Sequence, residues 1–101
     1  MILLFLWMKK TLKIVINECY GGFSVSDAVV KKLGLESPYD FNRTDERLIQ
    51  LVEADSRAAS GSCADLVVVY VPNEATDYMI NEYDGYETLY YVLDGKIKTA
   101  C

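Results

Sequence analysis

Apolar and polar residues alternate along several short segments of this chain, which is typical of β-strands. Residues 12–17, LKIVIN, form a β-branched run between polar residues and predict a first strand. Residues 65–71, DLVVVYV, are apolar at both alternating sets of positions, so we expect a central strand covered on both faces. Gly21 and Gly22 follow the first strand and supply the backbone freedom that a sharp turn needs.

The C-terminal part of the chain predicts an antiparallel meander. Residues 78–83 and 86–93 flank Asp84-Gly85, and Asp94-Gly95 precedes residues 96–99. An Asp-Gly pair between two alternating segments is a strong signal for a two-residue hairpin turn.

Two segments between the first two strands carry the period of an amphipathic helix. Ser24 or Ser26 is placed to cap a helix that runs through about Leu33. Thr44 is expected to cap a second helix, which should end around residues 59–61. Together these elements predict an α+β fold with one mainly antiparallel sheet of four or five strands and two helices on one face.

The length of 101 residues suffices for one domain, and 51% apolar and 25% charged residues are ordinary for a folded protein. We assign residues 12–101 to a single domain.

Residues 1–7 are apolar, but a membrane-spanning helix needs about 20 such residues, so no membrane association is expected. Residues 1–11 are interpreted as an upstream extension or disordered leader, with Met8 as the true start. A short edge strand or a hydrophobic anchor is the alternative.

The formal net charge is −5, from ten Lys and Arg against fifteen Asp and Glu, and the chain has no histidine. The acidic balance argues against direct nucleic-acid binding, which depends on neutralising phosphates. The missing histidine removes the usual general base and metal ligand.

Cys19, Cys63 and Cys101 form an odd set without CxxC spacing, so neither a disulfide framework nor a zinc site is indicated. We expect no metal or other cofactor, and a reducing cytoplasm fits the cysteine pattern.

Acidic residues and tyrosines concentrate in the C-terminal part. No Lys or Arg lies between Arg57 and Lys96, although seven acidic residues and six of the eight tyrosines fall there. Tyrosine offers a large contact area at low entropic cost, and surface acids steer association toward a basic partner. The plainer interpretation is that tyrosines favour strands and acids keep a small domain soluble. We expect a surface that binds a basic protein, formed by Tyr78, Glu82, Tyr83, Asp84, Tyr86 and Glu87.

The segment CYGGFS, between the first strand and the first helix, permits three interpretations. In an enzyme, Cys19 would be the nucleophile, but no histidine exists to activate it. In a purely structural role, Cys19 is a small buried hydrophobe and the glycines form a turn. In a small-molecule or nucleotide-signal site the spacing matches neither GxGxxG nor GxxxxGK[ST]. The ligands of that site would be Cys19, Tyr20, Gly21, Gly22, Ser24, Arg43 and Arg47.

Residues 13–26, KIVINECYGGFSVS, and residues 42–72, together with NEYDGYE at residues 81–87, resemble a family of small phage and prophage proteins. The resemblance covers most of the chain from Lys13 to Glu87. The chain departs from the family in the residues before Met8 and in a short link between the helices. The resemblance implies a phage origin and the bacterial host cytoplasm, and it brings no activity or catalytic residues.

Small acidic phage proteins without catalytic equipment commonly bind and block host machinery. We therefore expect a non-enzymatic accessory protein that antagonises a host factor, such as a defence system, through the acidic tyrosine-rich surface. A homo-oligomer formed through an exposed sheet edge would also suit so small a core.

Overall fold

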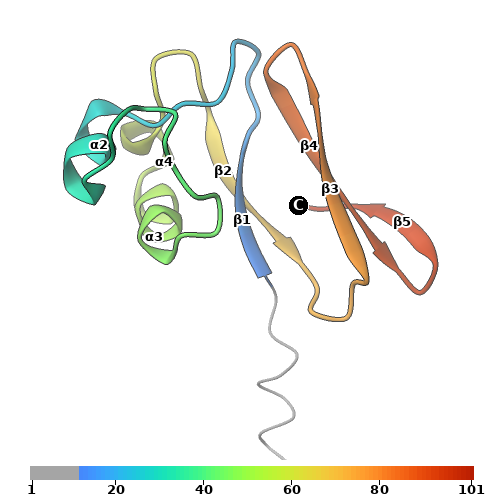
Figure 1. The fold of residues 1–101 in the computed structure, drawn as a ribbon. Helices are drawn as coiled ribbons and strands as arrows, with labels where there is room; N and C mark the ends of the chain where they lie inside the picture. The colour runs from blue at the N-terminus through green and yellow to red at the C-terminus, as the bar shows by residue number, and fades with distance from the viewer. Residues whose placement is uncertain (1–11) are drawn as a thin grey trace, which may run out of the picture.

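A computed structural model describes residues 12–101, and the predicted leader, residues 1–11, lies outside the described residues (Figure 1). Strands account for more of this part of the chain than helices do, so the predicted α+β class is confirmed. The elements are, in chain order, β1 (Leu12–Asn17), α2 (Asp27–Leu33), α3 (Glu46–Ala54), α4 (Ser56–Ala59), β2 (Leu66–Val71), β3 (Asp77–Tyr83), β4 (Tyr86–Leu93) and β5 (Lys96–Thr99).

The strands divide into two antiparallel sheets, where the sequence predicted one. β1 pairs with β2, and β3, β4 and β5 form a meander with β4 in the middle. The division has a local cause at the outer edge of β1. There the N–H of Val15 donates to the carbonyl of Arg43, at 3.0 Å, so a loop occupies the position that a neighbouring strand would take.

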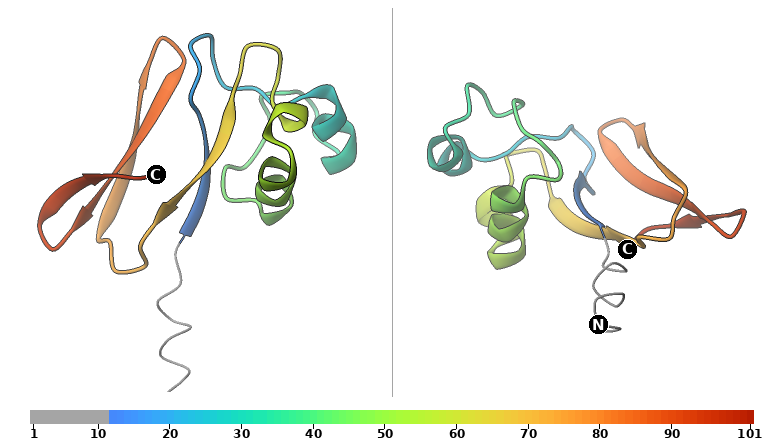
Figure 2. Two further views of the ribbon diagram at one scale, coloured as in Figure 1. Left: turned by 180° about the vertical axis from the view of Figure 1, so that it is seen from behind. Right: turned by 60° about the horizontal axis from the view of Figure 1, so that its bottom comes forward.

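The described residues form three layers: the helices, the β1–β2 sheet and the β3–β4–β5 sheet (Figures 1 and 2). Alternation along β1 explains this arrangement, because Val15 faces the helices while Ile14 and Ile16 face the second sheet. β2 is divided in the same way, with Leu66 toward the helices and Val69 toward Leu89 of β4. The prediction that DLVVVYV is covered on both faces is therefore confirmed.

The helices begin and end where short polar residues and glycine allow. Ser26 caps α2 by accepting the N–H of Val29, and Gly34 ends it with φ +70°. The prediction that Thr44 caps the second helix is wrong, because Asp45 is the cap and its carboxylate accepts the N–H of Arg47 at 2.9 Å.

The second helix also ends earlier than predicted. Asp55 is extended, with φ −161°, and divides the expected helix into α3 and the short α4. The side chain of Asp55 caps α4 by accepting the N–H of Ala58. α2, α3 and α4 lie on one face of the β1–β2 sheet (Figure 2).

Candidate partner-binding site

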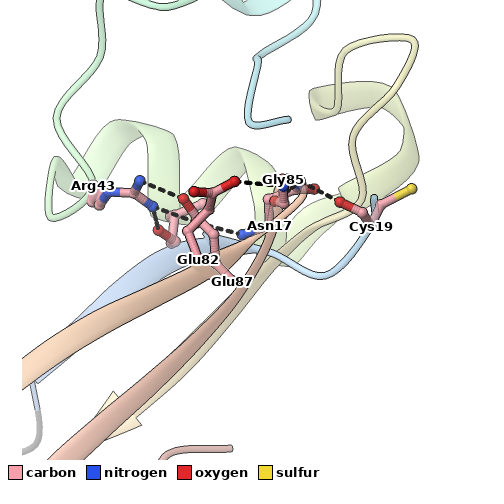
Figure 3. Close-up of polar contacts among 7 residues, drawn as sticks. Asn17, Cys19, Arg43, Glu82, Gly85 and Glu87 are labelled. Carbon is pink, nitrogen blue, oxygen red and sulfur yellow. Dashed lines mark hydrogen bonds and ion pairs between the residues drawn. The ribbon is translucent and has the colours of Figure 1, made fainter. Parts of the chain in front are cut away.

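Arg43 and Glu87 form a bidentate ion pair at the edge of β1. Nη1 and Nη2 of Arg43 donate to Oε1 and Oε2 of Glu87, each at 2.7 Å, and Nη1 also donates to the carbonyl of Val15 at 3.1 Å (Figure 3). Glu87 is 5% exposed. The guanidinium lies over the ring of Phe23, 4.4 Å from its centroid, and Phe23 stacks on Phe41. A buried carboxylate needs a paired cation and filled hydrogen-bonding positions, and Arg43 supplies both.

Asn17, the last residue of β1, connects this pair to three loops. Its backbone N–H donates to Oε1 of Glu87 at 2.9 Å. Its side-chain Nδ2 donates to the carbonyls of Cys19 and Gly85, at 2.7 and 2.9 Å (Figure 3). Its Oδ1 accepts the N–H of Asp65 at 2.7 Å. The residue itself is completely buried, and its partly buried side-chain bonds fix the loops to one another.

The turn between β3 and β4 packs against the glycine turn after β1. Asp84 and Gly85 both have positive φ, +52° and +90°, as a type I′ hairpin turn requires. The N–H of Gly21 donates to the carbonyl of Asp84 at 3.0 Å. A Cβ built on Gly85 would meet the backbone nitrogens of Gly21 and Gly22 at less than 3.0 Å, so only glycine permits this approach.

Three tyrosine rings cluster where these two turns meet. The ring of Tyr20 lies edge-on to that of Tyr83, with centroids 6.5 Å apart, and is tilted against that of Tyr86 at 5.2 Å. Tyr20 is 60% exposed and Tyr83 is 74% exposed. The cluster therefore presents aromatic surface to solvent while its backbone is held by the hydrogen bonds of Asn17 and Gly21.

Exposed carboxylates flank the rings along the chain, and Glu82 lies on the opposite face of the hairpin, beside Glu87 (Figure 3). Glu82 and Asp84 come from the hairpin, and Glu18 comes from the loop that carries Tyr20. Oε2 of Glu82 accepts the N–H of Gly85 at 2.6 Å, which stabilises the turn and leaves the carboxylate at the surface. We define the tip surface as Glu18, Tyr20, Glu82, Tyr83, Asp84 and Tyr86.

Basic side chains in the described part of the chain contribute nothing to the tip surface. Lys13 pairs with Glu53, whose hydrogen bond raises the pKa of Lys13, and Arg43 pairs with Glu87. Arg47 pairs with Asp45, and its hydrogen bond holds the pKa of that carboxyl below its usual value. The remaining basic residues lie on α2, α4 and β5, namely Lys31, Lys32, Arg57, Lys96 and Lys98.

The structure places four of the six residues predicted for partner binding at the tip of the β3–β4 hairpin. Glu82, Tyr83, Asp84 and Tyr86 share the tip surface. Glu87 was placed on this surface wrongly, because its carboxylate is buried against Arg43. Tyr78 is exposed but lies at the other end of β3, opposite Tyr91. Sequence reasoning missed Glu18 and Tyr20 for this surface, although the glycines after Tyr20 were a signal of close approach between backbones.

The alternative anion site is not assembled as predicted. Arg43 is wrong as a free ligand, because Glu87 and the Val15 carbonyl occupy its guanidinium. Arg47 is paired with Asp45, and the N–H of Gly21 is used by Asp84. Gly22 lies in the glycine turn, and the half-buried Ser24 accepts the N–H of Gly61 through its carbonyl.

Cys19 is half-buried, and its thiol lies 3.4 Å from the carbonyl of Tyr20, its hydrogen-bonding partner. Within residues 12–101, no group of three or more Cys, Asp or Glu side chains is arranged to hold a metal ion. No helix in the same range is long and apolar enough to span a membrane.

Comparisons with protein-family models, curated proteins and solved structures found no match.

Proposed function

We propose that this chain is a non-enzymatic phage accessory protein that binds a basic surface of a host protein through the tip surface and thereby blocks it. The observation that carries the proposal is the cluster of Tyr20 and Tyr83, more than half exposed, on a fixed backbone among exposed carboxylates. Residues of this kind dominate the energetics of protein interfaces.

Rigidity favours the tip surface over other exposed tyrosines of the domain. Association loses free energy when loops and side chains must be ordered, and a surface held in advance loses less. The bonds from Asn17 to Gly85 and from Gly21 to Asp84 hold both turns before any partner arrives. Tyr39, in contrast, is 72% exposed on the connection between α2 and α3 and has no part in the ring cluster.

The charge of the tip surface indicates the chemistry of the partner. Glu18, Glu82 and Asp84 would raise the association rate with a surface rich in Lys and Arg, in a salt-dependent manner. Host proteins that hold nucleic acid present such surfaces, and defence systems contain many of them. The host and the phage origin rest on the family resemblance of the sequence.

Capture from bacterial lysate tests the proposal. Tagged parent protein is compared with Tyr20→Ala and with Asp84→Asn, which keeps a residue type suited to positive φ. Tyr39→Ala is the matched control, since it removes another exposed tyrosine ring outside the tip surface. We expect a basic host protein that the parent and Tyr39→Ala retain and that the two tip variants lose. Equal recovery by all four proteins would overturn the proposal.

A further inference from the structure

The edges of the β1–β2 sheet are covered by the chain itself. On the outer side of β1, the N–H of Val15 donates to the Arg43 carbonyl and the N–H of Asn17 donates to Glu87. On the outer side of β2, the N–H of Leu66 donates to the hydroxyl of Ser60 at 2.9 Å, and that of Tyr70 donates to the carbonyl of Cys101 at 3.2 Å. An exposed strand edge is a template for pairing with another chain, and these contacts remove that template.

The β5 edge of the other sheet is protected differently. β5 has only four residues and carries exposed lysines at Lys96 and Lys98. Short length and lysine side chains are common devices by which proteins prevent edge-to-edge pairing.

The β3 edge has none of these protections along most of its length. β3 has seven residues, without lysine or proline, and its register with β4 runs without a bulge. Tyr83 and Tyr86 flank the two-residue turn and form a hydrogen-bonded pair, so alternation directs the backbone groups of Tyr78, Ile80 and Glu82 away from β4. Asp77 covers one of them by accepting the N–H of Tyr78 at 2.8 Å. Within residues 12–101 no strand pairs with this edge.

We infer that β3 pairs antiparallel with β3 of a second copy of this chain, about a two-fold axis at Ile80. In this register Tyr78 lies opposite the partner's Glu82, and Asp77 lies opposite the partner's Tyr83. The outward-facing backbone groups of Tyr78, Ile80 and Glu82 would then form hydrogen bonds with the partner strand. This requires the Asp77 side chain to release the N–H of Tyr78. The meanders of both copies become one continuous sheet.

Self-complementary hydrogen bonding along β3 points to a second copy as the occupant, and the positions of the acids favour this register. Each copy carries a net charge of −5, yet the register places no acid directly opposite an acid. Each phenol of Tyr78 instead lies beside a carboxylate, which is able to accept its hydrogen bond. A shift that brought Glu82 opposite the partner's Glu82 would lose both advantages. The pairing is argued from the β3 edge and not from the proposed function, but it shares Glu82 and Tyr83 with the tip surface. The two tips would lie at opposite ends of the joint sheet.

Two substitutions of Tyr78 test the inference, since this side chain is 44% exposed and its replacement is expected to leave the fold intact. Tyr78→Glu sets two carboxylates against each other at both ends of the paired strands, whereas Tyr78→Lys sets an ammonium against a carboxylate. Sedimentation of the full chain over a concentration series should give a dimer for the parent. We expect Tyr78→Glu to raise the dimer dissociation constant roughly tenfold or more, and Tyr78→Lys to keep the dimer. Thermal unfolding of both variants controls for the fold.

Cross-linking tests the register. Met79 lies opposite the partner's Asn81 as a non-hydrogen-bonded pair, with Cα atoms about 4.5 Å apart, which suits a disulfide. Met79→Cys combined with Asn81→Cys should form an intermolecular disulfide between these positions, located by peptide mass mapping. Met79→Cys alone should not, because the diagonal spacing of roughly 7–8 Å is too long.

A monomer at all concentrations would overturn the inference. So would a dimer that Tyr78→Glu and Tyr78→Lys affect equally, or a disulfide in another register. A β3 edge protected from hydrogen exchange only after a different protein is added would assign the edge to that protein and also contradict self-pairing.

Discussion

Arg43 and Glu87, 44 residues apart in the chain, form two hydrogen bonds of 2.7 Å across the edge of β1. The pair joins the connection between the helices to the second residue of β4. Because Glu87 also accepts the N–H of Asn17, the pair positions the hairpin that carries the tip surface.

Arg43→Lys keeps the charge but removes the planar fork and its stacking on Phe23. A lysine ammonium cannot bind both carboxylate oxygens and the Val15 carbonyl with this geometry. We expect the free energy of unfolding, measured in urea, to fall by about 1–3 kcal/mol. Arg47→Lys is the control, because Arg47 is exposed and should tolerate lysine without measurable loss. Equal stability of Arg43→Lys and the parent would contradict the structural role of the pair.

Gly85→Ala and Gly95→Ala compare two similar turns. Both glycines have positive φ, +90° and +75°, so each alanine is strained by roughly 1 kcal/mol. Only at Gly85 would the new Cβ meet the backbone of Gly21 and Gly22, whereas a Cβ at Gly95 would have no non-neighbouring atom within 4 Å. Thermal unfolding should show a clearly larger loss for Gly85→Ala, by roughly 1–3 kcal/mol. Equal losses would mean that the hairpin does not approach the glycine turn so closely.

Asn17→Ala should be among the most destabilising substitutions of a polar residue. It leaves the N–H of Asp65 and the carbonyls of Cys19 and Gly85 without their partner, and each of these partly buried groups costs up to about 1–3 kcal/mol. Asn81→Ala removes an exposed amide on β3 and serves as the control. Hydrogen exchange should show faster opening of residues 18–22 in Asn17→Ala alone. If hydrogen exchange of residues 18–22 is unchanged in Asn17→Ala, the Asn17 side chain does not hold these loops.

The free energy of unfolding at acidic pH should depend on the ion pair between Asp45 and Arg47. The side-chain hydrogen bond from Arg47 lowers the pKa of Asp45 from its usual 3.8. A carboxyl with a lowered pKa in the fold contributes stability above its ordinary pKa and loses that contribution as the pH falls through the lower value. Asp45→Asn should therefore be less stable than the parent at pH 6, with the difference shrinking below about pH 4. A difference that does not change with pH would contradict this assignment.

Local sequence signals predicted most of the strands and turns. The period of LKIVIN and DLVVVYV, the two Asp-Gly turns, and the Ser26 cap with its Gly34 stop all depend on neighbours within a few residues. The break at Asp55 escaped prediction, because the apolar period continues across it.

The division into two sheets and most of the candidate site depend on contacts between distant segments. Arg43 looked like a free cation and Glu87 like a surface acid, because nothing near either residue in the sequence reveals the other. Tyr20 and Tyr83 meet only through the close approach of two glycine turns. The acids and tyrosines of the hairpin were predictable as a group, but alternation along β4 turns Glu87 inward.

The most direct test of the tip surface is the affinity of the captured host protein for Tyr20→Ala and Tyr83→Ala, measured by calorimetry beside Tyr39→Ala. If the two rings are central to the interface, each tip variant should lose about 2 kcal/mol of binding free energy, roughly 30-fold in affinity, while Tyr39→Ala binds as the parent does. Parent-like affinity in both tip variants would contradict the account.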